Sequence, residues 1–555
     1  MHKSATPVAV IALATTFGLA ACGQEQGIPY TDVGGPFWDE IDFAQVTDHG
    51  HEVRLLDESE RIPAGPIELV DVTEQAGLAA AVGGGNQHGV GIGFVDLDGD
   101  ELPDIFVANG IGNRTGEVFS SALYQNQGDG SFRDVTAESG VGAILAGRDC
   151  YSVTAGDYDH DGDMDLYIGA QPTDVLLRNC GQVGTPCFED ATEEAGAGGP
   201  PSDAGLVQDG RSKIASFGDY DNDGDLDIVS ASKTLPAPYA YLLRNQGDGT
   251  FVDISEESGV HTHIDGNPCA VLWSDYDNDG DADIHIWNDR GGHVLLRNHD
   301  GQELEDVTRI SGLDAVQITH PMGIDAADID HDGDLDYYVS NIGDNPLLRN
   351  NGDGTFTDIT QSAGTGGDYG WGLAFEDFDG DSYPDIFIGQ EDDRPHLVFH
   401  NLANNDAPSF ARMEFEHAPI IDNRAAHNVA VAFADYDLDG RVDVVAAPTD
   451  GSRITLYRNQ TDVGSNQWLH VIVRDPDGVE STEGIGARVG VMTGGLLQFR
   501  DITGGSSRAS QNQLGVRFGL GDYSGADWVA VLWPTGRQAI ATRVAGGQTL
   551  VFGPE

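Results

Sequence analysis

The chain has 555 residues, enough for two to four average domains or for one large repeat domain with a smaller companion. It contains 28 lysine and arginine residues against 92 aspartate and glutamate residues, so its formal net charge is −64. This charge argues against nucleic acid as a partner, and the 39% hydrophobic content argues against a disordered acidic chain. Because the acidic residues are clustered, we expect bound divalent cations to neutralise them locally. Salt adaptation is the alternative.

The first 22 residues have the pattern of a bacterial lipoprotein signal. An apolar run from Val8 to Leu19 is too short to span a membrane permanently, and it is followed by Leu-Ala-Ala-Cys ending at Cys22. We expect cleavage before Cys22 and lipidation of its thiol. The protein would then be exported and either held on the outer envelope by its lipid alone or, if the signal is an ordinary one, secreted. Residues 23–66 are predicted to be a linker.

Four further cysteines form an even set in a chain expected to be exported, where disulfides persist. They are Cys150, Cys180, Cys187 and Cys269, which allow three pairings. Cys180 and Cys187 flank a short Gly/Pro loop, so we predict a disulfide between them. The pairing of Cys150 and Cys269 stays open.

From residue 67 onward the sequence repeats, and such recurrence is typical of propellers and solenoids. Each repeat has an Asp-rich segment preceded by an alternating apolar run, such as Val90, Ile92 and Phe94, and followed by a second apolar run. This pattern predicts a hairpin whose connection is the Asp segment. A third strand ends in Leu-Arg-Asn, as at Asn245, and after an Asp-Gly turn a fourth strand carries Asp-x-Thr or Asp-x-Ser. Four strands in each of seven repeats predict an all-β fold, a seven-bladed β-propeller over residues 67–462.

The ends of the repeat array predict closure into a ring. No fourth-strand phrase follows Asn459 in the last repeat, but a spare copy runs from Leu69 to Thr73, before the first Asp segment. We expect this N-terminal strand to complete the last blade, since closure pairs edges that an open array would leave exposed. Residues 463–555 alternate apolar and polar positions between Gly-rich turns, which predicts a small β-sandwich-like domain.

The Asp segments, numbered loops 1 to 7 in chain order, carry carboxylates at positions 1, 3, 5 and 9. Calcium takes six to eight oxygen ligands, and a tight loop with acids at alternate residues turns them onto one centre, whereas magnesium prefers a rigid octahedron with retained waters. We therefore predict that each loop binds Ca²⁺ and joins the first two strands of its blade. The predicted ligands are Asp96, Asp98, Asp100 and Asp104; Asp157, Asp159, Asp161 and Asp165; Asp219, Asp221, Asp223 and Asp227; Asp275, Asp277, Asp279 and Asp283; Asp328, Asp330, Asp332 and Asp336; Asp377, Asp379, Asp381 and Asp385; and Asp435, Asp437, Asp439 and Asp443.

Three of the loops depart from the common pattern, in which glycine stands at position 6. In loops 1 and 6 the glycine stands at position 4, so Glu101 and Ser382 must make the turn. In loop 7 the ligand set is complete but Arg441 occupies position 7. We expect weaker calcium binding at these loops, and at loops 1 and 6 above all.

The repeated loop resembles the Asp-x-Asp-x-Asp-Gly-x-x-Asp motif of FG-GAP or VCBS repeat proteins, over about residues 67–460. The tail resembles the ASPIC and UnbV domain through Trp468-Leu469-His470-Val471, Ile485-Gly486-Ala487-Arg488-Val489, Gly494-Gly495, Ser510-Gln511, Phe518-Gly519-Leu520-Gly521 and Val531-Leu532-Trp533-Pro534-x-Gly536. A propeller with this tail is similar to the cartilage acidic protein family. The resemblance implies a secreted or surface-tethered calcium-binding propeller, with adhesion or matrix roles proposed for animal relatives, and implies no enzymatic activity.

We favour a recognition or adhesion module for a protein or glycan ligand, because a propeller presents a broad face of loops on a rigid frame. A structural envelope protein is one alternative. A metal-dependent enzyme is another, because polar residues recur eight positions before each loop, at one expected rim of the central channel: His88, Asp149, Arg211, Asn267, His320, Tyr369 and His427. His88, His320 and His427 could hold a transition metal or transfer protons. Polar residues lining a wet channel explain the same pattern, and we predict no catalytic residue.

Overall fold

The computed structural model describes residues 47–553 except 57–60, 62–63, 79–89, 111–118, 200–212, 233–238, 264–265, 290–291, 317, 368, 391–393, 406, 414–427, 449–452, 475–483 and 506. The predicted signal segment and Cys22 therefore lie outside the described residues. No helix in the described part is long and apolar enough to cross a membrane. The described structure is dominated by strands, and the predicted all-β class is confirmed.

Seven sheets of the described chain each contain four consecutive or ring-closing strands. They are β3 (Gly91–Val95), β4 (Asp104–Ala108), β5 (Ala122–Asn126) and β6 (Phe132–Asp134); β7 (Asp149–Gly156), β8 (Asp165–Gln171), β9 (Val175–Asn179) and β10 (Phe188–Asp190); β11 (Lys213–Gly218), β12 (Asp227–Ser232), β13 (Tyr239–Asn245) and β14 (Phe251–Asp253); β15 (Asn267–Ser274), β16 (Asp283–Asp289), β17 (Val294–His299) and β18 (Glu303–Asp306); β19 (Pro321–Ala327), β20 (Asp336–Asn341), β21 (Leu347–Asn350) and β22 (Phe356–Asp358); β23 (Gly370–Glu376), β24 (Asp385–Gln390), β25 (Leu397–Asn401) and β26 (Phe410–Arg412); and β27 (Asn428–Ala434), β28 (Asp443–Pro448), β29 (Thr455–Asn459) and β2 (Leu69–Asp71). All pairings within these four-stranded sets are antiparallel.

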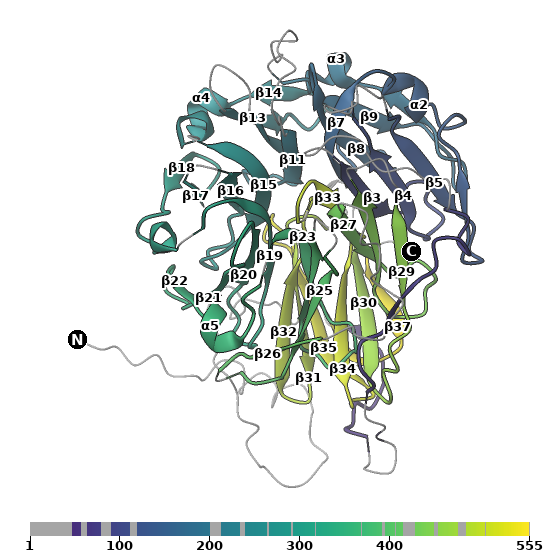
Figure 1. The fold of residues 1–555 in the computed structure, drawn as a ribbon, viewed down its shortest axis with the longest axis vertical. Coiled ribbons are helices and arrows are strands. Elements are labelled where there is room, and N and C mark those ends of the chain that lie inside the picture. Colours follow the sequence, from purple (N-terminus) through teal and green to yellow (C-terminus); the bar gives the residue numbers. More distant parts are fainter. Residues whose placement is uncertain are drawn as a thin grey trace.

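The sheets are arranged as a propeller, because their first strands contact one another in a closed ring. In order, β3, β7, β11, β15, β19, β23 and β27 each contact the next, and β27 contacts β3. The last sheet is completed by β2, whose Leu69 lies opposite Asn459 of β29. The predicted ring closure by an N-terminal strand is therefore confirmed. Figure 1 shows the purple to teal sheets set around one part of the ring and the green sheets completing it.

The repeated Asp-x-Thr/Ser phrase ties the fourth strand of a sheet to the third. In the third sheet, Asp253 Oδ1 accepts a hydrogen bond from the Ser255 backbone N–H at 3.0 Å, while Ser255 Oγ accepts one from the Leu242 N–H at 3.0 Å. Thr360 makes the same bond to Leu347 in the fifth sheet. A single helical turn follows the phrase in several sheets: α2 (Val141–Ile144), α3 (Thr192–Ala195), α4 (Ser255–Ser258) with η3 (Val260–His263), η4 (Leu313–Ala315) and α5 (Thr360–Ala363).

The C-terminal residues form two further sheets that share one hydrophobic cluster, the sandwich-like arrangement predicted. The five-stranded sheet has the order β1 (Thr47–Asp48), β36 (Gln538–Ala545), β35 (Gly525–Leu532), β31 (Arg488–Thr493) and β32 (Leu496–Asp501); the three-stranded sheet has the order β34 (Val516–Gly521), β30 (Gln467–Val473) and β37 (Gln548–Phe552). Strand β1 belongs to the segment predicted as a linker, and it pairs in parallel with β36. Part of that segment is therefore docked on the C-terminal domain.

The cysteines fall into one pair and two separated side chains. The structure joins Cys180 to Cys187, as predicted. Cys150 and Cys269 are buried in different hydrophobic clusters, one around β7 and one around β27, so they do not pair with each other.

Candidate metal-binding loops and the docked C-terminal domain

All seven Asp loops adopt one backbone shape, with left-handed residues at positions 4 and 6. In loop 2 these are His160 and Gly162, with φ of 63° and 88°. In loop 6 they are Gly380 and Ser382, with φ of 72° and 86°, and Glu101 of loop 1 has φ of 71°. The prediction that Glu101 and Ser382 make the turn is confirmed. The displaced glycine relieves strain at position 4 instead of position 6, so loops 1 and 6 keep the common shape.

The carboxylates at positions 1, 5 and 9 hold this shape by accepting backbone hydrogen bonds. In loop 2, Asp157 accepts from the Asp161 N–H at 3.2 Å and from the Gly162 N–H at 2.9 Å, and Asp161 accepts from the Asp163 N–H at 3.0 Å. Asp165, at position 9, is fully buried and accepts from the Tyr158 N–H at 3.2 Å and the Asn179 N–H at 2.7 Å. The loop is thus organised by its own acids.

Position 3 is different, because one of its carboxylate oxygens has no protein donor in most loops. In the described residues, a buried oxygen without a hydrogen-bond partner belongs to Asp98, Asp159, Asp221, Asp277, Asp330 and Asp437. Ligand atoms of Asp157, Asp159 and Asp165 lie within 4.8 Å of one another, as do those of Asp219, Asp221 and Asp227. A desolvated carboxylate oxygen without a donor is costly unless a cation binds it. The donor set, several carboxylates turned toward one centre in a tight loop, fits a hard divalent cation.

The raised pKa values of the loop aspartates also favour a bound cation. Burial, reinforced by neighbouring loop carboxylates, raises the pKa of Asp219 to about 8, of Asp221 to about 6 and of Asp330 to about 7. Burial likewise raises the pKa of Asp275 to about 7, although Arg488 opposes the shift. Ionising all of these groups together near neutral pH therefore costs free energy in the protein alone, and a bound cation would remove that cost.

A ring of asparagines links each loop to the next sheet, and sequence reasoning missed it. Asn245 of β13 donates through Nδ2 to the Tyr158 carbonyl of loop 2 at 2.9 Å, and its backbone N–H donates to Asp227 of its own loop. The same bond between sheets recurs all the way around. It is made by Asn126, Asn179, Asn245, Asn298, Asn350, Asn401 and Asn459. The signal was the Asn of Leu-Arg-Asn, which the sequence analysis interprets only as the end of the third strand.

Loop 7 has an arginine beside each carboxylate at positions 1, 3 and 5. Arg458 of β29 lies 2.6 Å from Asp437, Arg441 of the loop itself bonds Asp439, and Arg517 of β34 lies 3.5 Å from Asp435. This loop is neutralised by protein groups to a greater extent than loop 3, where Arg244 lies 3.8 Å from Asp221. Cation binding at loop 7 must displace or tolerate these charges.

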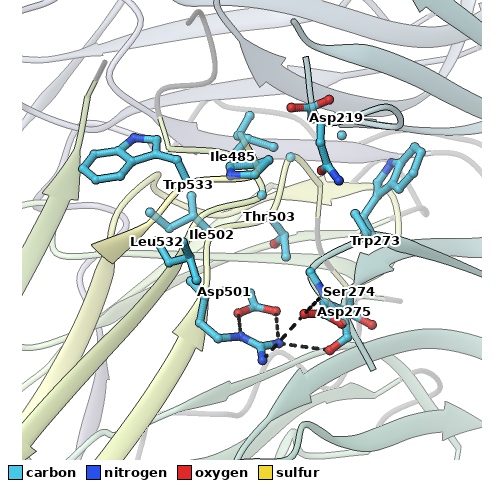
Figure 2. A pocket seen from close by; sticks show the side chains of 18 residues that line it. Asp219, Trp273, Ser274, Asp275, Ile485, Asp501, Ile502, Thr503, Leu532 and Trp533 are labelled. Atoms are coloured by element: carbon cyan, nitrogen blue, oxygen red, sulfur yellow. Dashed lines mark hydrogen bonds and ion pairs between the residues drawn. The ribbon is translucent and has the colours of Figure 1, made fainter. Parts of the chain in front are cut away.

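The C-terminal domain is docked on the face of the ring that carries the loops. Arg488 of β31 is buried and donates to both oxygens of Asp501, at 2.6 and 2.9 Å, and to the Asp275 carbonyl of loop 4 at 3.0 Å. Figure 2 shows Asp501 facing Asp275 and Ser274 on one side of a cavity of about 30 Å³, which Trp533 and Ile502 line from the C-terminal domain. So small a cavity between the domains is an interface and not a ligand pocket.

Loop 6 is contacted by two other parts of the C-terminal domain. Asn466 donates through Nδ2 to the Asp379 carbonyl at 2.9 Å, and the Gly521 N–H donates to the Gly380 carbonyl at 3.0 Å. A Cβ at Gly519 would clash with Asp377 Oδ2, which explains a glycine in the Phe-Gly-Leu-Gly phrase. Loops 4, 6 and 7 are therefore part of the interface between the domains as well as of their sheets.

The axis of the propeller is filled by the chain itself. Residues 503–513, here called the axial segment, reach the first strands of six sheets. Ser510 of β33 (Ser510–Gln511) pairs in parallel with Ile92, the Phe217 N–H donates to the Gly504 carbonyl at 2.8 Å, and the Gln513 N–H donates to the Phe433 carbonyl at 2.9 Å. Further bonds reach β7, β19 and β23. Figure 1 shows β33 beside β3 and β27. The wet channel considered above is thus occupied at this level.

The polar residues predicted at the rim are only partly described. His88, Arg211 and His427 lie outside the described residues. Of the three histidines considered as a metal site, the structure therefore describes His320 alone. His320 is half-buried, and its Nδ1 lies 2.6 Å from Asp289 Oδ1. The guanidinium of Arg394 lies 4.0 Å over the ring of Tyr369. His320 precedes β19 and Tyr369 precedes β23, so each lies at the end of a first strand that is away from the Asp loop.

Fold and loops together define a repeat propeller with a docked C-terminal domain, and family models agree. The FG-GAP-like repeat model matches residues 81–168, 219–286, 275–339 and 332–388, and the ASPIC and UnbV model matches residues 478–555. The chain therefore carries FG-GAP-like repeats followed by a C-terminal ASPIC and UnbV domain, as the sequence motifs predicted.

The chain is similar to cartilage acidic protein 1. The Homo sapiens protein is 25% identical over 499 residues, which cover 83% of this chain, and the Mus musculus protein is 25% identical over 485 residues, which cover 81%. The chain spans 62% of the length of each of these relatives. Among solved structures, an Agrocybe aegerita lectin that recognises terminal N-acetylglucosamine aligns at a TM-score of 0.38 with 20% identity, covering 66% of this chain and 87% of that chain.

Proposed function

We propose that the chain is an extracytoplasmic, calcium-stabilised β-propeller that acts as a recognition module for a protein or glycan ligand. The observation that carries the calcium part is the repeated loop with its unpartnered, buried position-3 oxygen. Arg488 and Arg517 neutralise some loop acids, but loops 1 to 3 have no such guanidinium of the C-terminal domain within ion-pair distance among the described residues. Calcium ions would supply the missing charge and join neighbouring strands.

Calcium binding is tested on protein stripped of metal by a chelating resin and titrated with CaCl₂ in a calorimeter. We expect several ions to bind and the melting temperature to rise with calcium, because the unfolded chain cannot assemble the loops. A melting temperature that does not change between stripped and calcium-saturated protein would contradict the proposal.

The ligand would meet the face of the ring opposite the loops, because the C-terminal domain contacts the loop face at loops 4, 6 and 7. Polar and aromatic residues such as Asp289, His320 and Tyr369 lie on that opposite face, at the starts or ends of central strands. A rigid ring that presents such residues on loops suits recognition.

A glycan array and a purified-protein binding panel, each run with calcium and with chelator, test recognition. A defined ligand should be captured in calcium, and capture should fall for His320→Ala and for Tyr369→Ala. Val252→Ala is the control, because Val252 is exposed on the fourth strand of its sheet, away from the axis. Absence of any defined ligand with folded, calcium-loaded protein favours the structural envelope role instead.

Location is the remaining part of the proposal. We infer a lipid anchor at Cys22 from the signal pattern and its Leu-Ala-Ala-Cys ending. Mass spectrometry of the mature N-terminus should find an acylated Cys22, and Cys22→Ala should release the protein from the membrane fraction. A mature chain that starts elsewhere, without lipid, contradicts the anchor and leaves a secreted protein.

A further inference from the structure

Loop 6 differs from the other loops in the residue that the third strand places beside it. The residue before the ring asparagine is arginine in five sheets: Arg178, Arg244, Arg297, Arg349 and Arg458. It lies 3.8 Å from the position-3 carboxylate in loop 4 and 2.6 Å from it in loop 7. Loop 1 has Gln125 at this position and loop 6 has His400. Among these seven residues, only His400 has a nitrogen that can bind a metal when neutral.

His400 lies where it can complete a three-ligand set. Its Nε2 is 3.2 Å from Asp379 Oδ2 and 3.8 Å from Asp381 Oδ2, and the three ligand atoms lie within 4.8 Å of one another. Nε2 is buried, and no hydrogen bond of good geometry satisfies it. Atoms this close can share one ion at nitrogen and oxygen bond lengths of about 2.0–2.2 Å after small side-chain movements.

The chemistry of this set differs from that of the other loops. Calcium is bound by oxygen ligands alone, whereas imidazole with carboxylates suits Zn²⁺ and other first-row divalent metals. Arginine in five of the other sheets adds a fixed positive charge beside the loop and no ligand, so it favours none of these metals. The side chains of His400 and Asp381 are 28% and 27% exposed, which leaves a path for an ion, while Asp379 is 6% exposed and holds the inner side.

We propose that loop 6 is a transition-metal site, in which His400, Asp379 and Asp381 bind Zn²⁺ or a similar ion in preference to Ca²⁺. This inference rests on the proposed cation-binding role of the loops and assigns one of them a different metal. The site lies against the C-terminal domain, because Asn466 bonds the Asp379 carbonyl and Gly521 bonds the Gly380 carbonyl. A zinc ion there would fix the shape of the loop against which Asn466 and Gly521 pack.

The test uses the mature chain, stripped of metal, saturated with CaCl₂ and then titrated with ZnCl₂ by calorimetry, with Co²⁺ absorption as a second readout of a nitrogen ligand. We expect one zinc ion to bind despite excess calcium. His400→Arg, the residue of five other sheets, should lower the zinc affinity about tenfold or more while the protein keeps its fold and its calcium binding. His299→Gln, which removes an exposed histidine beside Glu305, is the matched control and should bind zinc normally.

The outcomes separate this inference from the proposed function. Calcium binding without zinc binding, or zinc binding that His400→Arg does not change, overturns the loop 6 assignment alone and leaves His400 as a substitute for the arginine charge. Zinc binding that depends on His400, in a chain that binds no calcium, supports the assignment and overturns the calcium proposal. Circular dichroism of each variant verifies that a lost site is not a lost fold.

Discussion

Replacing Arg488 with methionine should loosen the C-terminal domain from the loops. Arg488 is 3% exposed, and the substitution removes its paired hydrogen bonds to Asp501 and its bond to the Asp275 carbonyl. Removing one member of a buried ion pair costs about 3–5 kcal/mol, because the remaining charge is left without a partner. We expect a loss of that size in the free energy of unfolding, measured by urea denaturation in calcium, and faster proteolysis between the two domains.

A second substitution distinguishes a lost ion pair from a general packing defect. In the double variant Arg488→Met with Asp501→Leu the main partner charge is removed together with the arginine, and calcium at loop 4 would balance the remaining Asp275, so most of the loss should be recovered. Arg133→Met is the surface control, since its contact with Glu138 at 3.4 Å is exposed and should change stability by no more than about 1 kcal/mol. A loss below about 1 kcal/mol for Arg488→Met, or a double variant as unstable as the single one, would refute the reasoning.

Three further predictions concern the loops and the asparagine ring. The gain in melting temperature on adding calcium to stripped protein should be larger at pH 8 than at pH 5.5. Burial raises the pKa of Asp221 and Asp330 in the folded chain, so the metal-free protein loses stability as the pH rises through about 6 to 7. An equal gain in melting temperature at both pH values would contradict this. Asp221→Asn should remove more calcium affinity than Asp437→Asn, measured by calorimetry, because Arg458 already pairs with Asp437; the reverse order would count against neutralisation of loop 7. Asn245→Ala should lower the free energy of unfolding, measured by urea denaturation, by about 2–3 kcal/mol, because the Tyr158 and Leu226 carbonyls lose a buried donor. A change under about 0.5 kcal/mol would show that this bond between sheets contributes little.

Much of the fold could be predicted because its rules are local and repeated. Each Asp loop sits between two apolar runs, and the spare phrase from Leu69 to Thr73 predicted the pairing with β29 that the structure contains. The αL turn at Glu101 and Ser382 followed from the displaced glycine alone. The pattern of an Asp loop between two apolar runs occurs seven times, so the prediction of a hairpin did not depend on any single repeat.

The contacts between repeats could not be predicted, because they depend on register in space. Asn245 donates to a loop 87 residues earlier in the chain, and no spacing along the sequence indicates which carbonyl it meets. His400 differs from the arginines at its position, yet its approach to Asp379 required the hairpin geometry. The axial segment carries no periodic pattern, so its place among six first strands was not foreseen, and the expectation of a wet channel did not allow for it.

The axial segment also has a consequence for the order of assembly. Ser510 and Gln513 are made after every strand that they touch in the ring, since synthesis runs from the N-terminus. Strand β29 is also made before them, so β2 can close the ring on β29 before its centre is filled. A chain that ends early would display unpaired backbone groups along its axis. Insertion of the tail is then the step that distinguishes a finished protein from a truncated one.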